Sequence, residues 1–403
     1  MIRSSPRTTS ALINWAHAID HYAMLIFPTA VLAIGPEVGL GYGEMIGLST
    51  ACFVAFGVFA LPAGWLGDHW SRRNMMAVFF LGCGVMMIAT GLAPNGVWLA
   101  VSLFLLGVFA AIYHPVGVAM LIAAADPARR GRALATNGVA GNLGAALAAV
   151  VTATIAALAG WRVAFIAPGV VSILSGFAFL ALVREERATR ATRSTVAEVP
   201  LDPRLIGAFV GLFAIVVLFG GLVFNAVSIA LPKIVDERGG VTGLPLMLTG
   251  GLATAVFLCG ALTQLAVGRL VERFPPHFVF LGTAALQLAG LTLAALTTGV
   301  PLLVGLALAM SGIYGQVTVN DVVIARFTAD AWRGRVYAVR FFLGLGTAGF
   351  AVLAVGLMHD RGGFDLVLGV LLSMATVFVG AVMGLSGLAH HMERRAESLQ
   401  AAE

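Results

Sequence analysis

The chain has 403 residues, of which 60% are hydrophobic and only 11% are charged, and its formal net charge is +5. Soluble domains carry about 25% charged residues, so a chain this apolar could not cover its surface with polar groups in water. The composition excludes an ordinary soluble protein and indicates a protein embedded in a lipid bilayer. Nucleic acid is not an expected partner, because the arginines that give the positive charge sit in loops between apolar segments.

Twelve runs are long and apolar enough to cross a bilayer, which takes about 20 residues per helix. Those of the first half cover residues 11–34, 45–66, 75–94, 97–124, 133–158 and 163–183. Those of the second half cover residues 205–231, 246–267, 277–297, 300–325, 336–357 and 366–389. We therefore expect an all-α polytopic membrane protein with twelve transmembrane helices in two pseudo-symmetric six-helix halves.

The expected domain organisation follows from these runs and from the polar stretch between them. That stretch contains an Arg-Glu-Glu-Arg run, threonines and two prolines, a composition typical of a linker. The predicted parts are an N-terminal half at 1–183, a cytoplasmic linker at 184–204, a C-terminal half at 205–389 and a cytoplasmic tail at 390–403.

Charged residues predict the orientation. Only three of the 43 charged residues fall inside the spans, namely Asp20, Asp321 and Arg340. With the N-terminus in the cytoplasm, cytoplasmic segments hold 19 Lys and Arg residues and the opposite side holds four. Cytoplasmic loops of membrane proteins carry such an excess. We therefore expect a multi-pass protein of the bacterial inner membrane, monomeric, with both termini in the cytoplasm.

Two motifs recur at nearly the same separation, close to half the chain length. A Gly-x-Leu-x-acid motif ends the second span at 64–68 and the eighth span at 268–272. An Arg-Gly-Arg motif follows the fourth span at 130–132 and the tenth span at 333–335. Duplicated halves around a central site are the architecture of carriers that work by alternating access.

The longer signature Gly-x-Leu-x-Asp-x-x-x-Arg-Arg at 64–73 resembles the loop motif of the major facilitator superfamily, and the Gly-Trp-Arg-Val-Ala-Phe run at 160–165 is typical of it. His17, the His114-Pro115 pair and the Gly-Asn-Leu-Gly run at 141–144 are similar to the fosmidomycin-resistance group of drug exporters. The loop motif departs from the family pattern at two positions, and the fourth span lacks an embedded arginine. These departures count against proton-driven drug antiport, though not against transport.

The resemblance implies a latch between the halves. Asp68 would face the start of the eleventh span, near Arg335, and Glu272 would face the start of the fifth, near Arg132. Acidic groups are stabilised at helix N-termini by about 0.3–1 kcal/mol. The alternative is that Asp68 and the arginines beside it only enforce topology. The expected gating residues are Gly64, Asp68, Arg72, Arg73, Arg132, Gly268, Glu272, Arg273 and Arg335.

Intramembrane polar residues concentrate in spans one, four, seven and ten. Because polar groups facing lipid are costly, these spans should face one another or a water-filled cavity. The expected substrate-binding residues are Tyr22, Tyr113, His114, Asn225, Tyr314, Gln316, Asn320 and Arg340. Arg340 has three interpretations: an ion pair with Asp321 at equal depth, a contact with an anionic substrate, or a side chain that extends to the interface.

On the first span, His17, Asp20 and His21 share one helical face. Asp20 and His21 lie about 12–15 Å into the span, near mid-membrane. Histidine titrates near neutrality, so the group is a candidate proton-binding site. The expected proton-coupling residues are His17, Asp20, His21, His114 and Asp321. A structural hydrogen-bonded cluster is the alternative.

His114 precedes Pro115 in the fourth span, where a proline breaks helix hydrogen bonding. This pair is either a hinge or cavity wall, or an ordinary interhelical contact.

No motif for ATP binding, for a metalloprotease or for a serine nucleophile occurs. The three cysteines show no disulfide or zinc spacing. We therefore expect no enzyme, no cofactor and no bound metal, but a secondary active transporter for a small solute, with proton-coupled export of an organic compound as the first hypothesis. The alternatives are proton-coupled uptake of an organic anion or metabolite, a transition-metal carrier and a transporter-like receptor.

Overall fold

The computed structural model describes residues 5–126, 129–184, 203–240, 243–327 and 330–400, and every regular element within them is a helix. The first half contains α1 (Pro6–Val38), α2 (Tyr42–Gly47), α3 (Thr50–His69), α4 (Arg72–Gly91), α5 (Gly96–Ala110), the π-helical turn η1 (Tyr113–Gly117), α6 (Val118–Ala124), α7 (Arg130–Ala159) and α8 (Trp161–Leu182). The second half contains α9 (Pro203–Arg238), α10 (Leu246–Arg273), α11 (Pro276–Leu296), α12 (Gly299–Phe327) and α13 (Asp330–Gln400).

Eleven segments of the described chain are long and apolar enough to cross a membrane. The last, Gly346–His391, has 46 residues, about twice what one crossing requires. The backbone of α13 leaves helical geometry at Gly362 and Gly363, and Gly363 has φ +58°, a conformation that glycine adopts without steric cost. Because α13 thus holds two crossing segments, the described helices agree with the predicted twelve-helix, all-α polytopic fold.

Several boundaries differ from the sequence prediction for identifiable reasons. The first helix begins at Pro6 and not at residue 11, because the Ser5 side chain accepts a hydrogen bond from the Thr8 N–H and caps the helix. The second span is divided into α2 and α3, and the fourth is divided at η1, where Pro115 lies. Pro203 begins α9, and α13 continues through the predicted tail to Gln400. Of the predicted linker, residues 185–202 lie outside the described residues.

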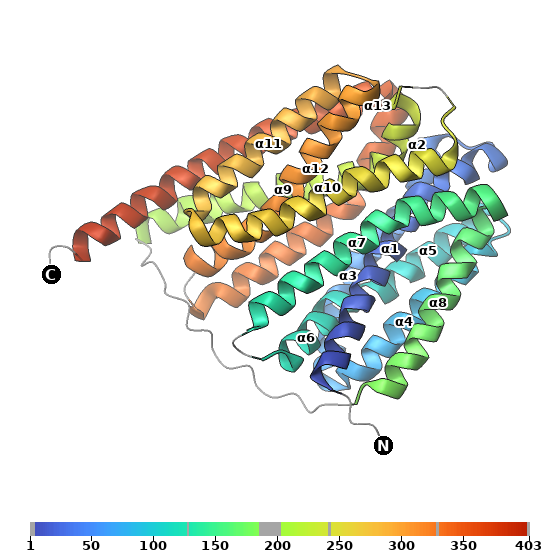
Figure 1. The fold of residues 1–403 in the computed structure, drawn as a ribbon, viewed down its shortest axis with the longest axis horizontal. Coiled ribbons are helices and arrows are strands. Elements are labelled where there is room, and N and C mark those ends of the chain that lie inside the picture. Colours follow the sequence, from blue (N-terminus) through green and yellow to red (C-terminus); the bar gives the residue numbers. More distant parts are fainter. Residues whose placement is uncertain (1–4, 127–128, 185–202, 241–242, 328–329, 401–403) are drawn as a thin grey trace.

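The helices form two adjacent bundles, α1–α8 and α9–α13 (Figure 1). Across the boundary, α7 packs along α10 and α3 packs along α13. The α7–α10 contact is partly polar: the Thr254 hydroxyl donates to the Ala146 carbonyl over 2.6 Å, and Asn142 donates to Gln264. Since these bonds join residues more than 100 positions apart, they fix how the two bundles meet.

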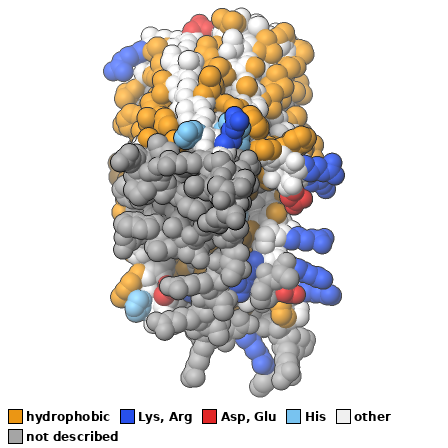
Figure 2. Space-filling view, turned by 90° about the vertical axis from the view of Figure 1, so that its left-hand side faces the viewer, with side chains coloured by type: hydrophobic (Ala, Val, Ile, Leu, Met, Phe, Trp, Pro, Cys, Tyr) orange, Lys and Arg blue, Asp and Glu red, His pale blue; other side chains and the backbone are white. Residues whose placement is uncertain are grey.

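The two ends of the bundle are distinguished by the chain termini. We call the end that carries the start of α1 and the end of α13 the terminal end, and the other the opposite end (Figure 1). Figure 2 views the molecule from the left of Figure 1, with most of the visible Lys and Arg side chains in the lower part and hydrophobic side chains covering the upper part. Basic residues bordering an apolar surface are expected of a protein that crosses a bilayer.

At the opposite end, α2 contacts α13 across the two halves. The Gly43 N–H donates a hydrogen bond to Asp360 Oδ1 over 3.1 Å, and the Tyr42 ring lies 4.8 Å from the His359 ring. A Cβ atom on Gly43 would collide with the Asp360 carboxylate. The absence of a side chain at Gly43 therefore allows this end of the bundle to close.

Replacing Gly43 by Val should separate α2 from α13 and shift the protein toward conformations that are open at the opposite end. The measurement is the distance between spin labels at Glu44→Cys and Arg361→Cys, two exposed positions, by pulsed electron paramagnetic resonance. We expect a longer, broader distance distribution in Gly43→Val than in Gly47→Val, where no described atom lies within 4 Å of the added Cβ. Identical distributions in the two variants would refute the closure.

Candidate functional site

A cavity of about 290 Å³ lies between the two halves. The first half contributes α1, α3, η1 and α7, and the second half contributes α9, α12 and α13. Of the predicted site residues, the cavity is lined by Asp20, His21, His114, Asn225, Tyr314, Gln316, Asn320 and Arg340. Polar residues from spans one, four, seven and ten therefore meet at one place in the fold.

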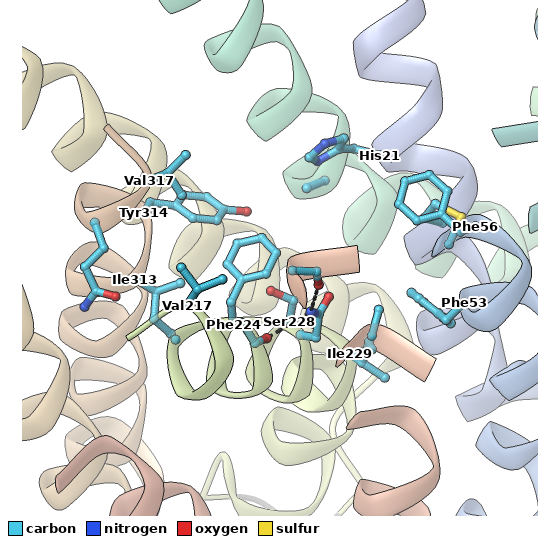
Figure 3. A pocket seen from close by; sticks show the side chains of 18 of the residues that line it. His21, Phe53, Phe56, Val217, Phe224, Ser228, Ile229, Ile313, Tyr314 and Val317 are labelled. Atoms are coloured by element: carbon cyan, nitrogen blue, oxygen red, sulfur yellow. Dashed lines mark hydrogen bonds between the residues drawn. The ribbon is translucent and has the colours of Figure 1, made fainter. Parts of the chain in front are cut away.

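Most of the cavity wall is apolar. Phe53 and Phe56 from α3 lie on the side of His21, whereas Phe224 and Tyr314 lie on the other side (Figure 3). The Tyr314 hydroxyl points toward the centre of this view. Apolar walls with a few convergent polar groups are typical of sites for small organic molecules.

Asp20 is the most deeply buried ionisable group at the cavity, with a side chain that is 0% exposed. Its Oδ2 lies 3.5 Å from His114 Nε2, whereas neither carboxyl oxygen has a hydrogen-bond partner among the described residues. An isolated carboxylate charge is very costly in such surroundings. The carboxyl group must therefore carry a proton or face a protonated His114.

A hydrogen-bonded network lies beside this pair, with the His17 and His21 rings 5.5 and 5.9 Å from the His114 ring. His17 Nδ1 lies 2.7 Å from the Asn137 carbonyl, which only accepts, so Nδ1 carries the hydrogen. The Nε2 of a neutral His17 is then an acceptor, and His21 Nε2, at 3.1 Å, donates to it. The Tyr113 ring stacks on His17 at 4.6 Å, and the Tyr113 hydroxyl donates to Asn137 Oδ1 over 3.0 Å. Because His21 Nε2 carries the donated hydrogen, His21 Nδ1 is the nitrogen that remains able to accept a proton.

Of the predicted proton-coupling and substrate-binding residues whose side chains the structure describes, three lie outside the cavity lining. His17 and Tyr113 are buried behind it, and the Tyr22 hydroxyl lies 3.3 Å from that of Thr152 in α7. Sequence reasoning missed Asn137, which joins α1, η1 and α7. Its signal is an amide within the apolar fifth span, whereas the predicted polar residues concentrate in spans one, four, seven and ten.

The rings of His17, His21 and His114 bring one nitrogen each to within 4.8 Å of one another. A transition metal would need those nitrogens as free ligands. Both nitrogens of His17 already have hydrogen-bond partners, Asn137 and His21. The arrangement therefore fits a hydrogen-bonded cluster better than a resident metal centre.

On the side of the second half, amide side chains hold the helices together around the cavity. Asn225 of α9 donates to the Gly344 carbonyl of α13 over 3.4 Å, and Gln316 of α12 donates to Gln287 of α11 over 2.7 Å. Arg340 is half-buried at the cavity. The side chain of Asp321 lies outside the described residues, so its pairing with Arg340 and its proton-coupling role stay predictions.

The predicted latch residues occupy the terminal end of the bundle. Asp68 pairs with Arg72 one turn later at 2.6 Å, while Arg73 donates to the Val183 carbonyl at the end of α8. Glu272, Arg273 and Arg132 are exposed, and no ion pair joins Glu272 to Arg132 where the chain is described. The side chain of Arg335 lies outside the described residues. The latch stays a prediction for a conformation closed at this end.

Two pseudo-symmetric helical bundles around a central cavity define a polytopic membrane carrier. Residues 12–339 match the sequence profile of the Major Facilitator Superfamily. The chain belongs to that superfamily, and the expectation of a transporter rather than an enzyme is confirmed.

Curated relatives match part of the chain. The puromycin resistance protein pur8 of Streptomyces alboniger is 29% identical over 47% of this chain and 37% of its own length. The probable L-galactonate transporter of Escherichia coli (strain K12) is 25% identical over 47% of this chain and 42% of its own. The chloramphenicol efflux pump MT0201 of Mycobacterium tuberculosis is 25% identical over 57% and 55%, respectively. The matches thus span about a third to a half of these relatives' lengths.

Solved structures share the whole fold. A bacterial homologue of the human lysosomal transporter Spinster, in an inward-facing and occupied conformation, aligns with a TM-score of 0.73 and 14% identity, covering 98% of both chains. The unoccupied inward-facing form aligns with a TM-score of 0.67. At this identity the likeness establishes the fold alone.

Proposed function

We propose that the protein is a secondary active transporter that exports a small organic compound across the inner membrane by alternating access, driven by protons. The observation that carries the proposal is the contact between Asp20 and His114 at the cavity. The carboxyl group is sealed from solvent, whereas the His114 side chain is 23% exposed. One side chain therefore touches both the candidate proton site and the space for the solute.

This geometry supports coupling by exchange. A proton held between Asp20 and His114 leaves the pair neutral or internally compensated, while its loss leaves a buried carboxylate charge. A solute that contacts His114 changes the free energy with which the pair binds that proton. Proton and solute then bias the same equilibrium between conformations, which is the requirement for coupled transport.

The relatives support export and keep uptake as the second candidate. Two relatives are named for resistance to, or efflux of, the antibiotics puromycin and chloramphenicol. A relative named as a probable L-galactonate transporter keeps an organic anion as the alternative solute, for which Arg340 at the cavity is a suitable partner. The excess of arginine in the predicted cytoplasmic loops supports an orientation with both termini in the cytoplasm.

Proteoliposomes test the proposal with chloramphenicol, puromycin and L-galactonate as labelled probes. We expect an imposed proton gradient to drive at least one probe against the proton flow, and a protonophore to abolish the movement. Movement of the probe with the protons would establish the uptake alternative. Transport that ignores the gradient would refute proton coupling, and transport of Zn²⁺ or Co²⁺ in its place would favour a metal carrier.

A further inference from the structure

Two glycines of α3 form a groove that receives the π-helical turn η1. A Cβ atom on Gly64 would lie 3.1 Å from Pro115 Cβ, and one on Gly67 would lie 2.8 Å from Val116 Cγ2. Residues three apart lie on one face of a helix, so both contacts belong to a single surface. A side chain at either glycine would push η1 away from α3.

The turn held in this groove carries His114. A proline has no N–H to donate, and a π-helical turn replaces the regular helix hydrogen bonds with wider ones. The backbone around His114 is therefore weakly constrained by its own helix. Packing against the neighbouring helices α1, α3 and α4 therefore sets the position of the imidazole, 3.5 Å from Asp20, and α3 contributes the contacts of Gly64 and Gly67.

The repeat shows that the groove is not a requirement of the shared loop motif. Gly268, the counterpart of Gly64 in α10, has no described atom within 4 Å of an added Cβ. The counterpart of Gly67 is Val271. The second half keeps the motif without the groove, so the close contact made by the glycine pair of α3 occurs only in the half that carries His114, within the described residues.

We propose that Gly64 and Gly67 are positioning residues that hold His114 against Asp20 and so set how tightly the pair binds its proton. The inference rests on the proposed proton site. The glycine pair also lies next to the predicted latch at the terminal end, because Asp68 directly follows Gly67. The titratable groups described around the pair are His17 and His21 from α1, Cys52 from α3, Cys83 from α4 and Tyr113 from η1.

The test follows the protonated carboxyl band of Asp20 by infrared difference spectroscopy of the purified full-length protein as pH is varied. The band is assigned by its loss in Asp20→Asn. We expect Gly67→Ala to move the midpoint of this titration by about one pH unit, a shift typical of a changed local environment. Gly251→Ala, where no described atom lies within 4 Å of the added Cβ, should titrate like the wild type.

Complementary substitutions distinguish the positioning role from a purely structural effect. Val116→Ala removes the atom that Gly67→Ala would strike, so the double variant should return the midpoint toward that of the wild type. Should Gly67→Ala fail to fold, the milder Gly64→Ala and the single Val116→Ala must each move the midpoint. An unchanged midpoint in these variants overturns the positioning role. A wild-type protein without any titrating band that Asp20→Asn removes contradicts the proton site itself.

Discussion

Proton-driven transport should fall by about 100-fold or more when Asp20 is replaced by Asn, because the amide keeps the shape of the carboxyl group but cannot bind or release a proton. A positioned side chain that takes up and releases a proton typically contributes about 100- to 10,000-fold to a rate, and this range sets the size of the expected loss. The variant should be measured in proteoliposomes with an imposed pH gradient and a probe that the wild type transports. We expect exchange of the probe without a gradient to be less affected than gradient-driven movement.

His69→Gln is the matched control for Asp20→Asn. His69 is an exposed titratable residue at the end of α3, where its ring bonds to the Trp65 carbonyl. Its replacement removes an ionisable group far less buried than Asp20 and should leave gradient-driven transport unchanged. An Asp20→Asn protein with full proton-driven activity would remove Asp20 from the mechanism.

Replacing Gly144 by Val should destabilise the protein markedly. A Cβ on Gly144 would collide with the Ala18 carbonyl oxygen and lie 2.6 Å from Ala18 Cα, so the obstacle is backbone that cannot rotate away. Overpacking typically costs about 1–3 kcal/mol, occasionally more, and here it would force α1 from α7. The separation would also break the bond from His17 to Asn137. The measurement is the midpoint of thermal unfolding in detergent.

Gly380→Val gives the comparison for this stability effect. Gly380 is exposed on α13, and no described atom lies within 4 Å of an added Cβ. Its unfolding midpoint should match that of the wild type. Equal midpoints for Gly144→Val and Gly380→Val would show that the α1–α7 contact tolerates a side chain, contrary to the geometry.

The glycines of α7 show which part of a helix contact the local sequence predicts and which part it does not. Their spacing predicts close approach of a neighbouring helix but does not say which one. Gly141 and Gly144 pack against His17 and Ala18 of α1, in the same half, while Gly138 faces Gln264 of α10. Sequence identifies a residue small enough for contact, but the partner helix is a property of the assembled bundle.

The sequence by itself determined the class of protein, the crossing segments and the duplicated loop motifs. These features depend on transfer of apolar residues into lipid and on charges kept at helix ends, which act within one segment at a time. The break at Pro115 follows from the same local reasoning, because proline removes a donor wherever it stands.

Only the tertiary structure decided which polar side chains meet. The contacts of Asp20 with His114, and of His17 with Asn137, join residues about 100 positions apart. Helical periodicity places a residue on a face, but the rotation and neighbours of that face come from packing all the helices together. The burial of Asp20 and the packing of η1 against the α3 glycines are therefore consequences of the tertiary structure. Burial of a side chain depends on the space that all its neighbouring helices leave around it.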